Sequence, residues 1–320
     1  MTQTQAVETR AFFDLPFTKM QGAGNDVVVL NAMHGLPALT PAHFRILGDR
    51  RYGVGCDQIL MVAPPKHPEN DFSYRIVNQD GSEVEHCGNG ARCFMRYVLD
   101  QGLTHKTSVR VEIARGVITL TLCDDGEVEV NMGVPDFAAH SLPFVPEGLA
   151  RVIHKNGFVE YAIPVGQGSP HLERSVLVGT VSVGNPHAVC VVGDADTAAV
   201  SQHGALIETH AAFANRVNVG FMQVLDEHHI KLRVWERGVG ETLACGTGAC
   251  AAVVVGIQLG LLQSPVQVQA RGGTLSVAWQ SATNAALDTG ADPDSLDPKD
   301  ILMRGPAVSV YTGSIRLAAQ

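Results

Sequence analysis

The sequence has no long apolar run, no cluster of basic residues and no recognisable export signal. Its longest apolar stretch, Ala249 to Ile257, is far shorter than the roughly 20 residues that cross a bilayer, so it predicts a core helix. The formal net charge of −9 argues against a nucleic-acid or membrane partner, because such partners usually leave a basic patch in the sequence. Residues from Met1 to about Phe17 lack the basic start and apolar centre of a secretory signal, and we interpret them as a frayed N-terminal extension.

The cysteines do not form the pattern of a disulfide framework. There are seven, an odd number at irregular spacing in a chain without an export signal, which favours reduced thiols in the cytoplasm. The apolar and charged fractions are those of a soluble globular protein. With 320 residues the chain is about twice the usual length of one domain, so we expect two domains.

Two cysteine segments, one in each half of the chain, match each other. In both segments a glutamate stands four positions before the cysteine and Gly-x-Gly-Ala follows it. The glutamate and cysteine are Glu83 and Cys87 in the first half, and Glu241 and Cys245 in the second. The two segments lie much farther apart than successive units of a solenoid repeat. Internal similarity at such a distance can reveal a duplicated domain.

The correspondence continues upstream of both cysteines, in the same order. The matched pairs are Gly24-Asn25 with Gly184-Asn185, Gln58 with Asn218, and Asn78 with Glu236. The last pair lies nine positions before each cysteine, at the end of the strand-like runs 72–77 and 230–235. We infer that two homologous halves face each other across a pseudo-two-fold axis.

Each half is predicted to contain many short strands and one long helix. Strand patterns separated by Gly, Asn and Asp turns occur at 108–113, 117–122 and 128–132. The helix predicted at 247–259 is apolar on all sides, and the one at 89–99 is apolar except for two arginines, so both must be largely enclosed by protein. We therefore predict an α+β fold of two homologous domains, each a mainly antiparallel sheet or barrel wrapped around a central helix. Residues 281–299, rich in Asp, Pro, Ala and Thr, are predicted to be an exposed loop insertion.

Both matched cysteines stand where a glycine-rich turn opens a helix. Free backbone N–H groups and the positive end of the helix dipole then point toward each sulfur, which favours the thiolate over the reference pKa of about 8.5. The same N–H groups, around Gly88, Asn89, Gly246 and Thr247, are suited to bind a substrate α-carboxylate.

Two such half-sites suit the inversion of a stereocentre. Inversion needs one group that removes a proton from one face of a carbon and another that returns a proton to the opposite face. Two cysteines related by a pseudo-two-fold axis supply that geometry when one is a thiolate and the other a thiol. The pattern therefore predicts a two-base epimerase or racemase.

The motifs together resemble those of the diaminopimelate epimerase family, in order and in spacing over nearly the whole chain. They are Gly22-Ala-Gly-Asn-Asp26, Asn78-Gln-Asp-Gly-Ser-Glu83, the segment 87–93, Gly184-Asn-Pro-His187, Arg216-Val-Asn218, Glu236-Arg-Gly238 and the segment 244–250. The resemblance implies an isomerase that interconverts LL- and meso-diaminopimelate in lysine and peptidoglycan precursor synthesis. It also implies Cys87 and Cys245 as the acid–base pair, with no metal, no pyridoxal phosphate and no other cofactor.

The resemblance also implies roles for further residues. The substrate pocket would be lined by a polar set, namely Asn25, Gln58, Asn78, Asn185, Asn218 and Arg237. Arg237 suits the distal carboxylate because a guanidinium donates two hydrogen bonds side by side, while His187 and Glu236 would lie near the reacting centre and tune it. Family members are usually homodimers, and Tyr311 matches a tyrosine at that contact. The halves would span 1–131 and 132–305, with a C-terminal strand at 306–320 returning to the first.

The chain departs from the family pattern at a few positions. Gln21 and Ala23 replace commoner residues in the first glycine motif, and Thr247 replaces a frequent Ser while keeping its hydroxyl. His86 stands where Gln is usual, and a cation beside Cys87 would alter the ionisation of that thiol.

Structural explanations compete with the functional ones. The cysteines outside the matched positions are expected to be small buried residues; they are Cys56, Cys93, Cys123, Cys190 and Cys250. The asparagines could be turn residues, His187 a satisfied core histidine, and Glu236 with Arg237 a surface pair. Glu83 and Glu241 are expected to serve the structure and not to touch substrate.

Other functions are weighed against the epimerase. A proline racemase-like enzyme would not need the polar residues at Asn78, Asn185, Asn218 and Arg237. A dinucleotide-binding oxidoreductase is suggested by the glycines after Cys245 but lacks an acidic ribose partner, and no lysine stands in a convincing pyridoxal phosphate motif. The remaining alternative is a non-catalytic redox scaffold in which Cys87 and Cys245 form a disulfide.

Overall fold

The computed structural model describes residues 11–83, 87–114, 116–166, 175–280 and 300–319. The expectations for His86 and for the insertion at 281–299 lie outside these residues, as does the extension at 1–10. Among the described residues, no helix has the length and apolar character needed to cross a membrane.

The elements of the first half alternate short strands with one short and one long helix. They are β1 (Phe12–Gly22), β2 (Asn25–Asn31), α1 (Pro41–Gly48), β3 (Gln58–Ala63), β4 (Phe72–Asn78), α2 (Gly88–Asp100), β5 (Ser108–Ile113), β6 (Gly116–Leu122) and β7 (Val128–Asn131). The predicted strands and the predicted helix agree with these elements to within about one residue at each end.

The second half begins with three added elements and then repeats this order with one extra strand before its long helix, and one strand follows it. The added elements are a 3-10 turn (Ala139–Ser141), β8 (Arg151–Ile153) and β9 (Val159–Pro164). The rest are β10 (Ser175–Ser182), β11 (Pro186–Val191), α3 (Val200–Glu208), β12 (Asn218–Asp226), β13 (His229–Glu236), β14 (Gly240–Thr242), α4 (Gly246–Gln258), β15 (Val266–Ala270), β16 (Gly273–Ala278), β17 (Leu302–Gly305) and β18 (Val308–Ala318).

The two halves share one series of strand pairings. In the first half β1–β2, β3–β4, β5–β6 and β6–β7 are antiparallel, whereas β2–β3 and β4–β5 are parallel. The second half repeats the same senses in β10–β11, β11–β12, β12–β13, β13–β15, β15–β16 and β16–β17. The last strands of the two series, β7 and β17, pair antiparallel with each other, as a two-fold axis between equivalent strands requires. The predicted α+β fold of two homologous halves is confirmed.

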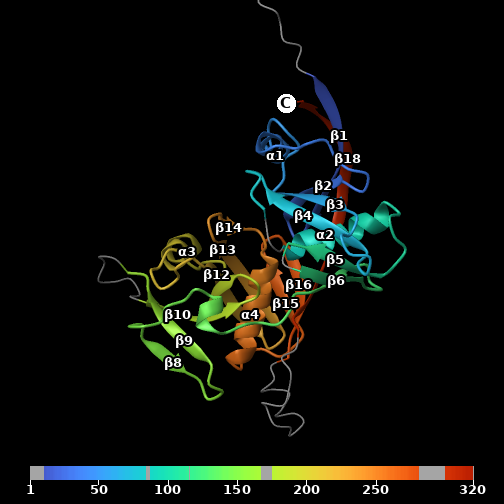
Figure 1. Cartoon of the computed structure of the whole chain (residues 1–320). Coiled ribbons are helices and arrows are strands. Elements are labelled where there is room, and N and C mark those ends of the chain that lie inside the picture. Colours follow the sequence, from blue (N-terminus) through green and yellow to red (C-terminus); the bar gives the residue numbers. More distant parts are fainter. Residues whose placement is uncertain (1–10, 84–86, 115, 167–174, 281–299, 320) are drawn as a thin grey trace, which may run out of the picture.

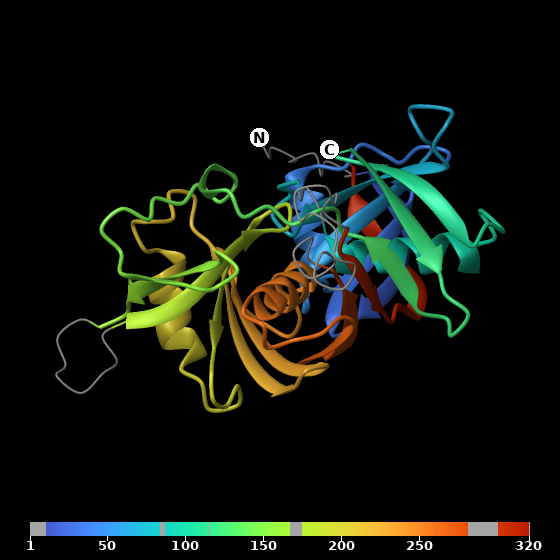
Figure 2. The same cartoon turned by 90° about the horizontal axis from the view of Figure 1, so that it is seen from below.

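A long helix lies inside each half and carries its core (Figure 1). Val253, Val254 and Val255 of α4 are all fully buried, and successive helix positions point about 100° apart, so α4 is enclosed on every side. Figure 2 shows α4 nearly end-on between the strands of the second half. Since burying one such side chain stabilises by about 1.5–3 kcal/mol, this helix fixes the position of its own N-terminus firmly.

The C-terminal strand β18 runs beside the N-terminal strand β1. The two pair antiparallel from Phe12 with Ala318 to Gln21 with Val308 (Figure 1). The interpretation of residues up to Phe17 as a frayed extension is therefore wrong for residues 12–17, which are ordered by a partner some 300 residues away. The pairing supports the predicted domain boundaries, which remain a prediction: one domain of residues 1–131 and 306–320, and another of residues 132–305.

Candidate active site

Cys87 and Cys245 occupy equivalent positions at the starts of the two central helices. Each is the residue before the first helical position and has an extended backbone. Each sulfur accepts a hydrogen bond at 3.4 Å from the third backbone N–H after it, from Gly90 in one half and from Gly248 in the other. The two thiols therefore have the same local geometry, as the repeated motif predicts.

The N-termini of α2 and α4 lie against each other. A Cβ added to Gly246 would lie 3.8 Å from the Cα of Gly88, and 3.2 and 3.3 Å from Sδ and Cε of Met303. A Cβ on Gly88 would lie 2.4 Å from the same Met303 methyl group. A side chain at either glycine would displace the end of Met303, which packs against both helix starts at the junction of the halves.

One carboxylate, that of Glu236, acts on both thiols. Its Oε1 accepts a hydrogen bond of 2.5 Å from Thr242, three residues before Cys245. The negative charge of Glu236 raises the pKa of Cys87 as well as that of Cys245. One carboxylate thus influences the ionisation of both thiols.

The expectation that the helix N-termini lower the pKa of both thiols is wrong in this structure. Burial raises the pKa of Cys87, and burial together with the charge of Glu236 raises that of Cys245 well above its ordinary value. The N–H groups of Gly90 and Gly248 oppose this shift but do not reverse it. The physical reason is that a thiolate loses more hydration energy inside the protein than one or two backbone hydrogen bonds return.

A cavity of about 650 Å³ opens between the halves next to this junction. From the first half it is lined by Gly24, Asn25, Arg50, Asp57, Gln58, Asn78, Gln79 and Asp80. From the second half it is lined by Glu236, Gly238, Val239, Glu241, Thr242, Leu243 and Ala244. The cavity thus unites four residues predicted from the sequence, Asn25, Gln58, Asn78 and Glu236.

Hydrogen bonds connect α2 to the cavity wall. The Asn89 amide donates to Asn25, at 2.9 Å to its backbone oxygen and 2.6 Å to Oδ1. Asn25 in turn donates to Asp57 at 3.1 Å. The chain of contacts connects the first turn of α2 to the lining of the cavity.

Arg50 and Asp57 are charged lining residues that the sequence analysis did not single out. Arg50 forms a two-pronged pair with Asp26, both bonds being 2.8 Å, and bonds Asp57 at 2.8 Å. Burial would raise the pKa of Asp26, but hydrogen bonds from Arg50 and Lys19 outweigh it and hold that pKa well below its usual range. Burial raises the pKa of Asp57. The only sequence signal was charge near the first glycine motif, which is common on surfaces.

The predicted residues of the second half also form a connected set. Thr247 Oγ1 lies 3.5 Å from the Cys245 sulfur and accepts a bond of 3.3 Å from Asn185, whose Oδ1 is 3.0 Å from Nε2 of His187. His187 is fully buried, and burial together with the nearby charge of Arg237 lowers its pKa to about 3. His187 is therefore neutral at pH 7, with Nε2 as the donor to the Asn185 oxygen.

Asn218 and Arg237 meet through the backbone. Asn218 donates to the Pro186 carbonyl at 3.3 Å and accepts from the Arg237 N–H at 2.9 Å. The Arg237 side chain is exposed, donates to the Asn215 carbonyl at 3.1 Å, and is not among the residues that line the cavity. Its role at a distal carboxylate stays a prediction.

Two predicted site residues carry buried polar atoms without a partner. Oε1 of Gln58 and Nδ1 of His187 make no hydrogen bond within the part of the chain that the structure describes. A buried polar atom left in this state costs about 1–3 kcal/mol. Both atoms are therefore suited to bind polar groups of a ligand.

The other cysteines and the matched glutamates have structural positions. All seven cysteines are free thiols, and four of the five outside the matched positions are buried, whereas Cys123 is partly exposed. Glu83 pairs with Arg75 at 3.2 Å, and Glu241 pairs with Arg233 at 2.7 Å and with Arg271 at 3.1 Å. Among the described residues, no group of three or more His, Cys, Asp or Glu side chains is placed to hold a metal ion.

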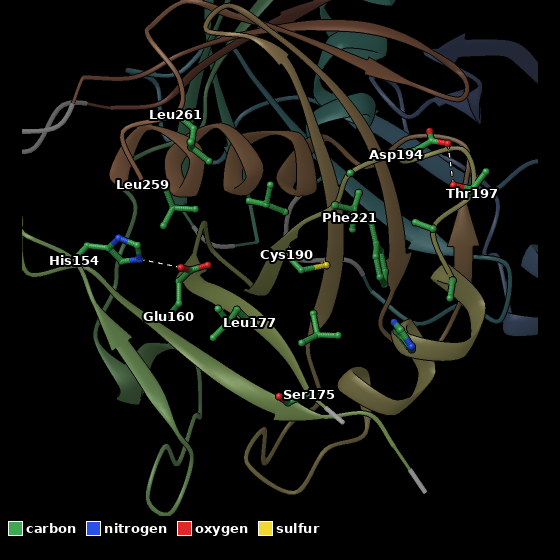
Figure 3. Close-up of a pocket in the computed structure, with 17 residues that line it drawn as sticks. His154, Glu160, Ser175, Leu177, Cys190, Asp194, Thr197, Phe221, Leu259 and Leu261 are labelled. Atoms are coloured by element: carbon green, nitrogen blue, oxygen red, sulfur yellow. Dashed lines mark hydrogen bonds and ion pairs between the residues drawn. The ribbon is translucent and has the colours of Figure 1, made fainter. Parts of the chain in front are cut away.

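A second cavity, of about 890 Å³, lies in the second half (Figure 3). Its polar groups are largely paired with one another: His154 with Glu160 at 2.8 Å, and Thr197 with Asp194 at 2.8 Å. None of the residues predicted for the site lines it. The cavity between the halves, in contrast, is lined by four of the predicted residues and reaches Ala244, next to Cys245, although neither Cys87 nor Cys245 itself lines it.

Comparison with known proteins identifies the family and supports the fold. The diaminopimelate epimerase family model matches residues 17–138 and 179–292. The chain is 55% identical over 305 residues to a diaminopimelate epimerase of Cupriavidus necator, covering 95% of this chain and 98% of the relative. It is 49% identical to a protein of the same name from Ralstonia pickettii, covering 95% and 97%.

Solved structures that are much less similar in sequence share the fold. A hydroxyproline epimerase from Agrobacterium vitis has a TM-score of 0.64 at 14% identity, covering 96% of this chain and 93% of that chain. A PhzF-family phenazine biosynthesis protein from Bacillus anthracis has a TM-score of 0.64 at 16% identity, covering 95% and 99%. The sequence motifs, the duplicated topology and the similarity to curated relatives over nearly the whole chain agree: the chain belongs to the diaminopimelate epimerase family.

Proposed function

We propose that this protein is an isomerase that interconverts LL- and meso-2,6-diaminopimelate, in the cytoplasm, as a step in lysine and peptidoglycan precursor synthesis. The observation that carries the proposal is the equivalent placement of Cys87 and Cys245 at two helix N-termini that lie against each other. The family relationship supplies the substrate, and the free thiols suit a reducing compartment.

The reaction needs two proton transfers at one carbon. The thiolate of one cysteine takes the α-proton, so that a C–H bond breaks and an S–H bond forms. The thiol of the other cysteine gives its proton to the opposite face, where a C–H bond forms and its own S–H bond breaks. In the reverse direction the two cysteines exchange roles, and no cofactor takes part.

The carbanion between the two transfers must be stabilised by the protein. The first N–H groups of both helices, at Gly88, Asn89, Gly246 and Thr247, are free of intrahelical partners and would bind the α-carboxylate. Two converging helix N-termini also favour the negative charge that develops beside that carboxylate. This electrostatic environment takes the place of an organic electron sink.

The polar residues around the cavity would recognise the rest of the substrate. Glu236 would accept from the ammonium at the reacting centre, and His187, neutral at pH 7, would position groups near it. The remaining polar set would bind the second amino-acid head; it comprises Asn25, Gln58, Asn78, Asn185, Asn218 and, at the rim, Arg237. A proline racemase-like enzyme would have no use for this second polar set.

Exchange of the α-proton with solvent tests the function directly. In D₂O with a reductant, both LL- and meso-diaminopimelate are expected to gain deuterium at the α-carbon and to interconvert, as followed by NMR and chiral chromatography. Proline is expected to show neither change. Absence of exchange in the reduced, folded protein rejects the epimerase, and racemisation of proline in its place supports the rival enzyme. A redox scaffold would respond to the reductant without any turnover.

We also propose that the protein is a homodimer that associates through β1 and β18. On β18, Val308, Val310 and Tyr311 are exposed apolar side chains, and Tyr311 packs edge-on against Phe17 of β1 with ring centroids 5.8 Å apart. Among the described strands, β18 pairs only with β1, so its outer edge is open to a second copy.

Removal of the Tyr311 ring is expected to weaken this dimer. Tyr311→Ala deletes a large aromatic side chain from the proposed interface, so light scattering on a sizing column is expected to show a dimer in the parent protein and monomer in the variant. The control is Tyr52→Ala, which removes an equally large ring that is 87% exposed in another region. A monomeric parent protein, or a variant that remains dimeric at the same dilution, contradicts the proposed interface.

A further inference from the structure

Arg92 is a buried cation within α2 that the proton transfers above do not use. It lies five positions after Cys87 and is 1% exposed. Nε donates to the Pro306 carbonyl at 3.3 Å, Nη2 donates to Asn89 Oδ1 at 3.1 Å, and Nη1 lies 3.7 Å from the Met303 sulfur. All three partners are neutral, and an arginine guanidinium is not deprotonated in proteins.

The surroundings of Arg92 are built to hold its guanidinium. A Cβ added to Gly22 would lie 3.2 Å from Nη2, and one added to Gly305 would lie 3.3 Å from Nε. Any side chain at either glycine would crowd the group. The cation is therefore fixed between β1, α2 and the segment that leaves β17.

No carboxylate within the described ranges forms an ion pair with Arg92; instead, thiols dominate its electrostatic environment. Burial lowers the pKa of Arg92, and the groups that oppose this shift are, in decreasing order, Cys93, Cys87, Cys250 and Glu127. A buried charge is costly unless an opposite charge compensates it. Of the three thiols, only that of Cys87 belongs to the proposed reaction, so its thiolate is the anion that the structure offers to Arg92.

The cation is present in one half only. When the two cysteine motifs are superposed, Arg92 corresponds to Cys250, a buried neutral thiol in α4. The second half has a negative group instead, Glu236, whose charge raises the pKa of Cys245. The pseudo-two-fold site is therefore asymmetric: the helix of Cys87 carries a buried cation and the helix of Cys245 does not, while the charge of Glu236 acts on both thiols.

We propose that Arg92 is a positioning residue of the first half-site, whose fixed charge favours the thiolate of Cys87 and thereby leaves the shared proton on Cys245. Its hydrogen bond to Asn89 also orients the first turn of α2, which is linked through Asn89 to Asn25 in the cavity wall. The part that concerns catalysis rests on the proposed epimerase function, whereas the effect on thiol ionisation does not.

Other charged and titratable groups also act on Arg92 or on Cys87. They are Cys93 on α2, Tyr74 on β4, Glu127 between β6 and β7, Glu236 on β13 and Cys250 on α4. Burial raises the pKa of Cys87 and the charge of Glu236 adds to that rise, while Arg92 and the Gly90 N–H lower it. Removal of Arg92 takes away one of the groups that oppose burial.

The test measures the ionisation of Cys87 without relying on turnover. In the full-length protein, the alkylation rate of Cys87 by iodoacetamide is followed against pH by mass spectrometry of its peptide. For Arg92→Gln we expect a displacement of the profile to higher pH and alkylation at pH 7 slowed about tenfold, because the thiolate is the reactive form. Arg92→Lys keeps the charge and is expected to stay within about threefold of the parent rate, but to lose about tenfold in kcat/KM because an ammonium cannot reach both Pro306 and Asn89.

The matched control is Arg96→Gln, on the same helix, where Arg96 is partly exposed and pairs with Asp100 at 2.9 Å. Its Cys87 profile is expected to match that of the parent protein. If the pH profile of Cys87 alkylation is unchanged in Arg92→Gln, the proposal is overturned. If that variant does not fold, a tenfold slower alkylation of Cys87 at pH 7 in Arg92→Lys overturns it. If the parent protein does not act on diaminopimelate, but alkylation of Cys87 still depends on Arg92 as expected, the proposed function is refuted. The effect of the Arg92 charge on Cys87 then still stands.

Discussion

Replacement of either Cys87 or Cys245 by Ala is expected to lower epimerisation by at least about 10²–10⁴-fold, the usual contribution of a positioned acid or base. Each variant removes the only sulfur on one face of the proposed carbanion. The helix N-terminus remains, because Ala keeps the backbone N–H groups of the first turn. The measurement is kcat/KM in both directions, starting from LL- and from meso-diaminopimelate.

The structure supplies controls for this experiment. Cys123→Ala and Cys190→Ala change thiols outside the site, one partly exposed and one buried, and are expected to keep activity within about threefold, since side chains remote from the chemistry seldom alter it more. Circular dichroism and thermal melting verify that each variant is folded. A folded Cys87→Ala or Cys245→Ala protein that still inverts the substrate would contradict the two-base assignment.

Glu236→Gln is expected to separate thiol reactivity from turnover. The Glu236 charge raises the pKa of both Cys87 and Cys245, so its removal lowers both, and a lower pKa means more thiolate at a given pH. Alkylation of Cys87 by iodoacetamide at pH 7 is expected to accelerate about tenfold, equivalent to about one pKa unit. Over the same pH range kcat/KM is expected to fall about 10- to 100-fold, because a hydrogen bond between a charged group and the substrate ammonium is worth about 1.5–3 kcal/mol.

Glu241→Gln is the matched control, because Glu241 lines the same cavity but is paired with Arg233 and Arg271. It is expected to leave the alkylation of Cys87 and kcat/KM within about threefold of the parent values, because its charge is already neutralised by partners. Slower alkylation of Cys87 in Glu236→Gln, or full activity in that variant, would remove Glu236 from the site. The Arg92→Gln and Glu236→Gln variants are thus expected to displace the Cys87 profile in opposite directions.

Local sequence patterns were enough to place the two cysteines and the helices that follow them. Glycines after Cys87 and Cys245 mark a turn, and the apolar residues beyond mark helices; the structure begins these helices at Gly88 and Gly246. Duplication of the motif made the pseudo-two-fold arrangement predictable, because equivalent landmarks in one order require equivalent positions in space. The residues lining the cavity from both halves were predictable only where they fell on those landmarks, as for Asn78 and Glu236.

Features that depend on remote segments were not predictable in this way. The strand at residues 12–17 is ordered by β18, and Arg50 and Asp57 reach the cavity through a network that includes Lys19 and Asp26. Neither contact leaves a periodic signal, because strand pairing and ion pairs between distant residues depend on how the chain returns to itself.

The sequence by itself thus determined which atoms are proposed to carry the chemistry: two thiols, each at a helix start, in a duplicated chain. Only the tertiary structure decided how those thiols ionise. Burial and the charge of Glu236 raise the pKa of both thiols, while the charge of the buried Arg92 lowers that of Cys87. The reason is that hydration and Coulomb energies depend on distance and burial, and both are set by packing between segments that the sequence separates.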